Sequence, residues 1–262
     1  MASLNKVVLA GNLTREPELR GVEVGRGKAR DEIVVCDFGI AVNRKGSEKT
    51  DFFAGVAWRG LGENLARYRG KGDAILLEGY VQRQAWQNDE GENRSRHVIV
   101  AQNIQYVDSA GQGFNSVMLA GNITRDPELR FAQVAGEAVP VCTFGLAVNR
   151  VRSSKGEAAQ GEANADFFDV TVWRELAEIV ANYKRKGDGI FLEGRLQYDS
   201  WKNGEGESRS KVSVVADTVQ FTSSKGDAPE EDDFEDIEVD EQPAPEKTRR
   251  KAGGYGRGRR GA

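Results

Sequence analysis

The stretch LNKVVLAGNLTREPELR at residues 4–20 returns as FNSVMLAGNITRDPELR at residues 114–130. Two further segments repeat in the same order, CDFGIAVNR (36–44) as CTFGLAVNR (142–150) and GKGDAILLEG (70–79) as RKGDGIFLEG (185–194). The offset between copies changes from segment to segment, so the length differences fall in the connecting loops, which tolerate them. A domain of about 110 residues is therefore present twice, and it is too long for a solenoid repeat, so each copy should have its own core.

Within the second copy, alternating apolar and polar residues predict five strands and one helix. The strands are expected near 115–123, 139–149, 166–173, 189–201 and 209–221. The helix, between the third and fourth strands, is expected to bury Leu176, Ile179, Val180 and Tyr183 and to end at Gly187; its first-copy counterparts are Leu61, Leu65, Tyr68 and Gly72. The order β-β-β-α-β-β is that of the OB-fold, a five-stranded barrel that binds oligonucleotides. The predicted fold is all-β, with two tandem OB-folds and a disordered C-terminal tail.

The expected domain boundaries follow from the repeat and from charge. Residues 1–108 form the first OB-fold, 109–113 a short linker, 114–223 the second OB-fold, and 224–262 the tail, which is acidic and then Gly/Arg-rich. The net charge of the whole chain is −4. The two copies are each close to neutral, so a basic groove would have to come from the arrangement of side chains rather than from bulk charge.

Few residues suit catalysis. The chain has two cysteines, Cys36 and Cys142, at equivalent positions of the two copies. Both lie on the apolar face of their predicted strand, so both are interpreted as small core residues. A single histidine, His97, has no counterpart in copy two. We expect no enzyme activity, no cofactor and no metal. The absence of a signal-peptide pattern at the N-terminus and of an apolar run of about 20 residues predicts a soluble, cytoplasmic protein with no membrane contact.

All four tryptophans occur on strand faces that are otherwise polar. Side chains alternate along a strand, so Phe168, Val170 and Val172 share one face and leave Phe167 and Trp173 on the other. The same reasoning in both copies makes the tryptophans candidates for stacking on nucleic-acid bases, namely Trp58, Trp86, Trp173 and Trp201. An aromatic ring on a polar face can stack on a base of any sequence. The alternative is packing against loops or a subunit interface.

Arg44 and Arg150 follow the second strand of each copy at equivalent positions. They are candidates for phosphate contacts beside the stacking residues, the alternative being ordinary solvated loop charges.

The chain resembles the bacterial single-stranded DNA-binding protein family through NKVVLAGNLTREPELR, the DFFxxxxW strand, the helix ending in YxxKG, and LEGYVQRQAW with its copy. The resemblance covers about residues 3–107 and 114–222 and is to the branch with two OB-folds per chain. It implies sequence-independent binding and protection of single-stranded DNA in replication, repair and recombination. It also implies stacking roles for Phe52 and Phe167, which complete with the four tryptophans the candidate set for binding single-stranded DNA. It further implies a homodimer presenting four OB-folds, for which we expect an interface that uses the first-strand region of the barrels.

Family members typically end in an acidic-hydrophobic tip that finishes in Pro-Phe and docks replication and repair proteins. This chain instead ends in GGYGRGRRGA and carries EEDDFEDIEVDE at 230–241, which looks like that motif moved inward. Phe234 and Ile237 are its candidate partner-binding residues. The alternative is a solubilising acidic linker.

Three other functions fit parts of the pattern. An RNA-binding or primosomal OB-fold protein would share the fold and the aromatic residues. A nuclease would need carboxylates on the polar face, for which copy two has Asp169 and Glu193 but copy one has Ala54 opposite Asp169. A structural adaptor would use the exposed aromatic residues to bind protein.

Overall fold

The computed structural model describes residues 3–26, 29–87, 91, 93–150, 165–202, 204, 206 and 208–222. Within these ranges neither helix is long and apolar enough to cross a lipid bilayer. The expected tail at 224–262 lies outside them.

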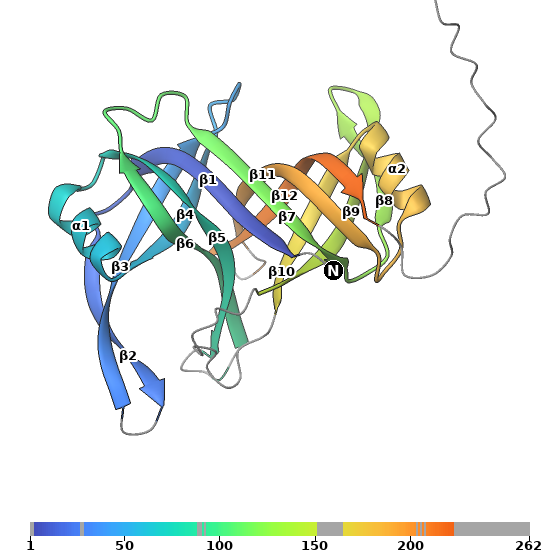
Figure 1. Cartoon of the computed structure of the whole chain (residues 1–262). Helices are drawn as coiled ribbons and strands as arrows, with labels where there is room; N and C mark the ends of the chain where they lie inside the picture. The colour runs from blue at the N-terminus through green and yellow to red at the C-terminus, as the bar shows by residue number, and fades with distance from the viewer. Residues whose placement is uncertain are drawn as a thin grey trace, which may run out of the picture. The chain divides into compact units, whose positions relative to one another are not determined.

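Each copy of the repeat folds into strands with one short helix (Figure 1). In copy one the elements are β1 Leu4–Leu13, β2 Glu18–Arg26, β3 Ala29–Asn43, β4 Thr50–Trp58, α1 Gly60–Tyr68, β5 Ala74–Gln87 and β6 Asn93–Tyr106. In copy two they are β7 Phe114–Ile123, β8 Glu128–Val134, β9 Glu137–Asn149, β10 Ala165–Trp173, α2 Glu175–Tyr183, β11 Gly189–Lys202 and β12 Ser208–Phe221.

Five strands of each copy close into a barrel. In copy one the neighbours run β1-β3-β4-β6-β5 and back to β1, and the barrel closes through a parallel β4–β6 pairing and an antiparallel β1–β3 pairing. Copy two closes in the same way through β10–β12 and β7–β9. The prediction of two tandem OB-folds, each with one helix between the third and fourth barrel strands, is confirmed.

The alternation of side chains places the core as the sequence predicted. Phe168, Val170 and Val172 are buried in β10. Cys36 and Cys142 are fully buried beside Phe38 and Phe144, and burial raises the pKa of each thiol to about 11. Both cysteines therefore stay protonated near neutral pH and pack as small apolar groups.

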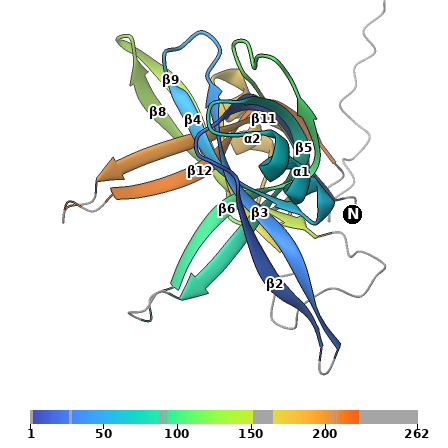
Figure 2. The same cartoon turned by 90° about the vertical axis from the view of Figure 1, so that its left-hand side faces the viewer.

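The structure contains one strand per copy that the sequence analysis missed. β2 pairs along β3, and β8 pairs along β9, so that long hairpins extend from the barrels (Figure 2). Every residue of β8 except Ala132 is exposed. A strand that is exposed on both faces has no apolar alternation, which is the signal used for the other strands.

The expected helix ends and one expected helix contact were wrong. α2 ends at Tyr183 because Lys184 is extended, and Gly187 lies in the next turn, where its φ of +98° suits glycine. Tyr183 is 72% exposed, whereas Ala177 and Val180 are the buried residues of this helix. Tyr68 in α1 is exposed as well. The buried face of the helix runs through Ala177 and Val180 and continues at Lys184 just after its end, so Tyr183 lies beside this face rather than on it.

The two barrels are joined through their first strands. β1 and β7 pair antiparallel from Leu4↔Ala120 to Ala10↔Phe114, and the pairing is symmetric about Val7↔Val117. Figure 1 shows these strands side by side. Because β1 also pairs with β5, and β7 with β11, both edges of each first strand are used within the chain. A homodimer interface in the first-strand region therefore cannot form by edge-to-edge pairing of β1 or β7 with a second chain, and it would have to use the faces of these strands.

Candidate nucleic-acid interface

The six candidate aromatic residues are all exposed on barrel strands. Exposure is between 38% and 50% for Phe52, Trp58, Trp86, Phe167, Trp173 and Trp201. Their neighbours Phe53 and Phe168 are buried, as alternation requires. A large apolar ring that is held half-exposed by a rigid strand is available for stacking without rearrangement of the core.

A groove of about 820 Å³ lies where the two copies meet and gathers three of these aromatic residues. Trp86 comes from the β5–β6 hairpin of copy one, and Phe167 and Trp201 come from β10 and β11 of copy two. Phe52, Trp58 and Trp173 do not line it, although Phe52 contacts the groove residue Tyr198 edge-on, with ring centroids 6.2 Å apart. The groove is thus built from equivalent hairpins of both copies and exists only when the copies are joined.

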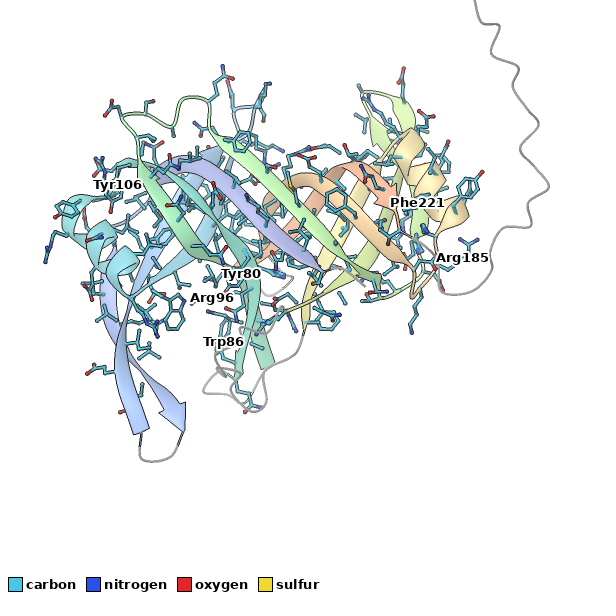
Figure 3. All side chains as sticks on the ribbon, viewed as in Figure 1. Tyr80, Trp86, Arg96, Tyr106, Arg185 and Phe221 are labelled. Atoms are coloured by element: carbon cyan, nitrogen blue, oxygen red, sulfur yellow. The ribbon has the colours of Figure 1, made fainter. Side chains whose placement is uncertain are left out.

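Four cationic side chains line the same groove, namely Arg83, Arg96, Arg125 and Lys211. The Arg96 guanidinium carbon lies 5.8 Å from the centre of the Trp86 ring. Both side chains are labelled in Figure 3. Arg83 donates a 3.1 Å hydrogen bond from Nη2 to Ser95 Oγ. Alternation of cations and aromatic rings is the arrangement that binds a single strand, with phosphates on the cations and bases on the rings.

Arg44 and Arg150, the two candidates for phosphate contacts, each bind an aspartate of their own copy. Arg44 donates to both oxygens of Asp51, at 2.8 and 2.6 Å, and also to the backbone oxygen of Tyr198 at 3.0 Å. The hydrogen bond to Asp51 raises the pKa of the Arg44 guanidinium above its usual value, against a smaller effect of burial. Because its donors are directed at protein acceptors, we leave Arg44 out of the proposed DNA contacts.

Arg150 makes the equivalent contacts, but here copy two donates to the backbone of copy one. It donates to both oxygens of Asp166, at 3.0 and 2.8 Å, and to the backbone oxygen of Arg83 at 3.2 Å. Asp51 also accepts from the backbone N–H of Tyr198, and Asp166 from that of Arg83. Each copy thus uses a buried Arg–Asp pair to hold a strand of the other copy, and we call these two pairs the latch.

The aspartates of the latch were not predicted from the sequence. Asp51 and Asp166 are 1% and 2% exposed, and each directly precedes a candidate stacking residue, Phe52 or Phe167. The Asp-Phe-Phe sequence that both copies share could have indicated them. Because side chains alternate along a strand, the aspartate lies on the same buried face as the second phenylalanine. A buried carboxylate needs a cationic partner, and the arginine that follows the preceding strand supplies it.

His97, which has no counterpart in copy two, packs on that copy. Its ring stacks on Phe168 with centroids 5.5 Å apart, and Nε2 lies 2.9 Å from the backbone oxygen of Phe167, to which it donates. Burial lowers the pKa of His97 below its ordinary value, more strongly than the Phe167 carbonyl raises it. A neutral imidazole thus fixes the backbone that carries Phe167 in the groove.

Asp169 also lies in the groove, with both carboxylate oxygens bound to cations. Oδ1 is 2.9 Å from Arg125 Nη2, and Oδ2 is 2.8 Å from Lys211 Nζ. Burial raises the pKa of this carboxyl, but the hydrogen bonds and charges of Lys211 and Arg125 outweigh it, so the net pKa lies below its ordinary value. Among the described residues no group of three or more histidines, cysteines and acidic residues is arranged to hold a metal ion.

The model of the single-strand binding protein family matches residues 4–107 and again residues 114–222. The chain belongs to this family. The two matches coincide with the two barrels, so the family domain occurs twice, and the resemblance inferred from the sequence is confirmed.

Several members of the family have the same extent. The single-stranded DNA-binding protein of Thermus aquaticus is 32% identical, with 81% of this chain and 82% of that protein covered. The one from Deinococcus radiodurans is 31% identical over 83% and 75%. The crystal structure of the wild-type Thermus aquaticus protein covers 88% of this chain and 98% of its own, with a TM-score of 0.63 and 28% identity.

The acidic run at 230–241, with the candidate partner-binding residues Phe234 and Ile237, lies outside the described residues. Its proposed correspondence to the acidic tip of the single-strand binding protein family therefore rests on the sequence alone.

Proposed function

We propose that this chain binds and protects single-stranded DNA without sequence preference, along the groove between its two OB-folds. The observation that carries the proposal is that Trp86 and Trp201, about half exposed, line one groove together with four cationic side chains. The relatives of the chain in the family are named single-stranded DNA-binding proteins, which supports the same assignment.

The proposed mechanism needs no catalytic group. Bases stack on Trp86, Phe167 and Trp201, because every base has a face that an aromatic ring can cover, while Arg83 and Arg96 neutralise phosphates. Phe52, Trp58 and Trp173 extend the path beyond the groove on the same polar sides of β4 and β10. Binding of this kind suits a cytoplasmic protein that coats the strands exposed during replication, repair and recombination.

Titrating the full chain with oligo(dT), while following tryptophan fluorescence, tests the proposal. We expect saturable quenching and an affinity that falls with salt, with a slope of about −0.7 per phosphate contact. A duplex of the same length should bind far more weakly, because its bases are already stacked. No saturable quenching or binding to oligo(dT) would contradict the proposal, and tighter binding to single-stranded RNA of matched sequence would favour the RNA-binding alternative.

We also propose that the chain forms a homodimer with four OB-folds, as the family resemblance implies. Since both edges of β1 and of β7 pair within the chain, the dimer would form through other surfaces of the barrels than these edges, including the faces of the first strands. Light scattering at micromolar concentration is expected to give twice the mass of the chain. A monomer mass under these conditions would contradict this proposal without affecting the DNA-binding one.

The acidic run at 230–241 is proposed to bind replication and repair proteins through Phe234 and Ile237. Apolar side chains within a run of carboxylates suit a partner that has an apolar pocket with a basic rim.

A further inference from the structure

At one position that faces the groove, copy two carries a carboxylate that copy one lacks. Asp169 in β10 pairs with Gly145 of β9, and the equivalent Ala54 in β4 pairs with Gly39 of β3. Both Asp169 and Ala54 line the groove. Copy two therefore places a carboxylate where copy one has a methyl group.

This carboxylate forms ion pairs with two of the four cationic side chains in the groove. Asp169 binds Arg125 at 2.9 Å through one oxygen and Lys211 at 2.8 Å through the other. All three side chains are between 37% and 49% exposed, so the ion pairs lie open to the groove and to any ligand in it. A phosphate that approaches Arg125 or Lys211 meets a carboxylate already bound there, and it is repelled by that charge.

We propose that Asp169 limits the affinity of copy two for single-stranded DNA, because it competes with the phosphates for Arg125 and Lys211. Copy one has no such competitor at Ala54, so its cations are available to the strand. The two OB-folds then contribute unequally to the affinity for single-stranded DNA, and copy one makes the stronger phosphate contacts. This inference rests on the proposed function, namely that the groove binds single-stranded DNA.

The variant Asp169→Asn removes the charge while keeping the size of the side chain. Each phosphate contact that it frees should strengthen binding to oligo(dT) about fivefold near 0.1 M salt and steepen the salt slope by about 0.7. With both cations freed, the gain is about 25-fold and the change in slope about 1.4. The reciprocal variant Ala54→Asp adds a carboxylate to the groove that Arg83 and Arg96 also line, so it should weaken binding and flatten the slope.

Glu193→Gln is the matched control, because it removes one negative charge from the same copy at an exposed residue that does not line the groove. It is expected to change affinity and slope little. Thermal melting of every variant shows whether the fold is kept, and if Asp169→Asn lowers the melting temperature, Ala54→Asp decides the question.

The outcomes separate the inference from the function on which it rests. If the unmodified chain does not bind oligo(dT), the proposed function fails. If it binds but Asp169→Asn leaves affinity and slope unchanged or reduces them, Asp169 positions the two cations for DNA or is irrelevant to it, and the inference is overturned. An equal gain in Glu193→Gln would overturn it too, because net charge alone would explain the effect.

Discussion

Replacing Asp51 with alanine is expected to lower the free energy of unfolding by about 3–5 kcal/mol. Asp51 is 1% exposed and accepts hydrogen bonds from Arg44 and from the backbone N–H of Tyr198. Its loss leaves a partly buried guanidinium without its counter-ion and the backbone N–H of Tyr198 without its acceptor. Denaturant titration of the full chain measures the change.

Asp166→Ala removes the equivalent half of the latch, and its effect should be similar because its contacts to Arg150 and to Arg83 are the same. Asp217→Ala is the control, since that carboxylate pairs with Arg195 while 60% exposed, and exposed pairs contribute about 0–1 kcal/mol. If both latch variants cost no more than Asp217→Ala, the buried pairs do not hold the copies together.

Much of the fold could be predicted because it depends on local patterns that occur twice. The alternation in β10 separates buried Phe168 from exposed Phe167, and the same rule placed all six candidate aromatic residues on exposed faces. Parity also placed both cysteines in the core. These features depend only on neighbours within one strand, so a single sequence is sufficient for them.

The missed features depend on contacts between distant segments. The pairing of β1 with β7 joins residues about 110 positions apart, and nothing within either strand specifies that partner. The latch also connects Arg44 to a strand of the other copy, so the arginine could not be distinguished from a solvated loop residue. The groove has the same origin, because its walls come from both copies and its shape depends on how they join.

Replacing Trp86 or Trp201 with alanine is expected to weaken binding to oligo(dT) by about 1–3 kcal/mol each, and replacing both by about twice as much. Each ring is about half exposed on the wall of the groove, so a base can cover the exposed face. Since tryptophan is also the natural reporter, the measurement is fluorescence anisotropy of a labelled oligonucleotide. The salt slope should stay nearly unchanged, because no phosphate contact is lost.

Two further variants serve as controls for this loss of affinity. Tyr183 is 72% exposed on α2 and does not line the groove, so Tyr183→Ala should bind as the unmodified chain does. The melting temperature of the tryptophan variants should change little, because truncating a half-exposed ring leaves no core cavity, whereas a buried Phe38→Ala would cost about 3–5 kcal/mol of stability. Weak binding that accompanies a lowered melting temperature would indicate unfolding rather than lost stacking. Unchanged affinity and unchanged melting in the double variant would show that the bases do not stack on these residues, and the path of the strand would then have to lie outside the groove.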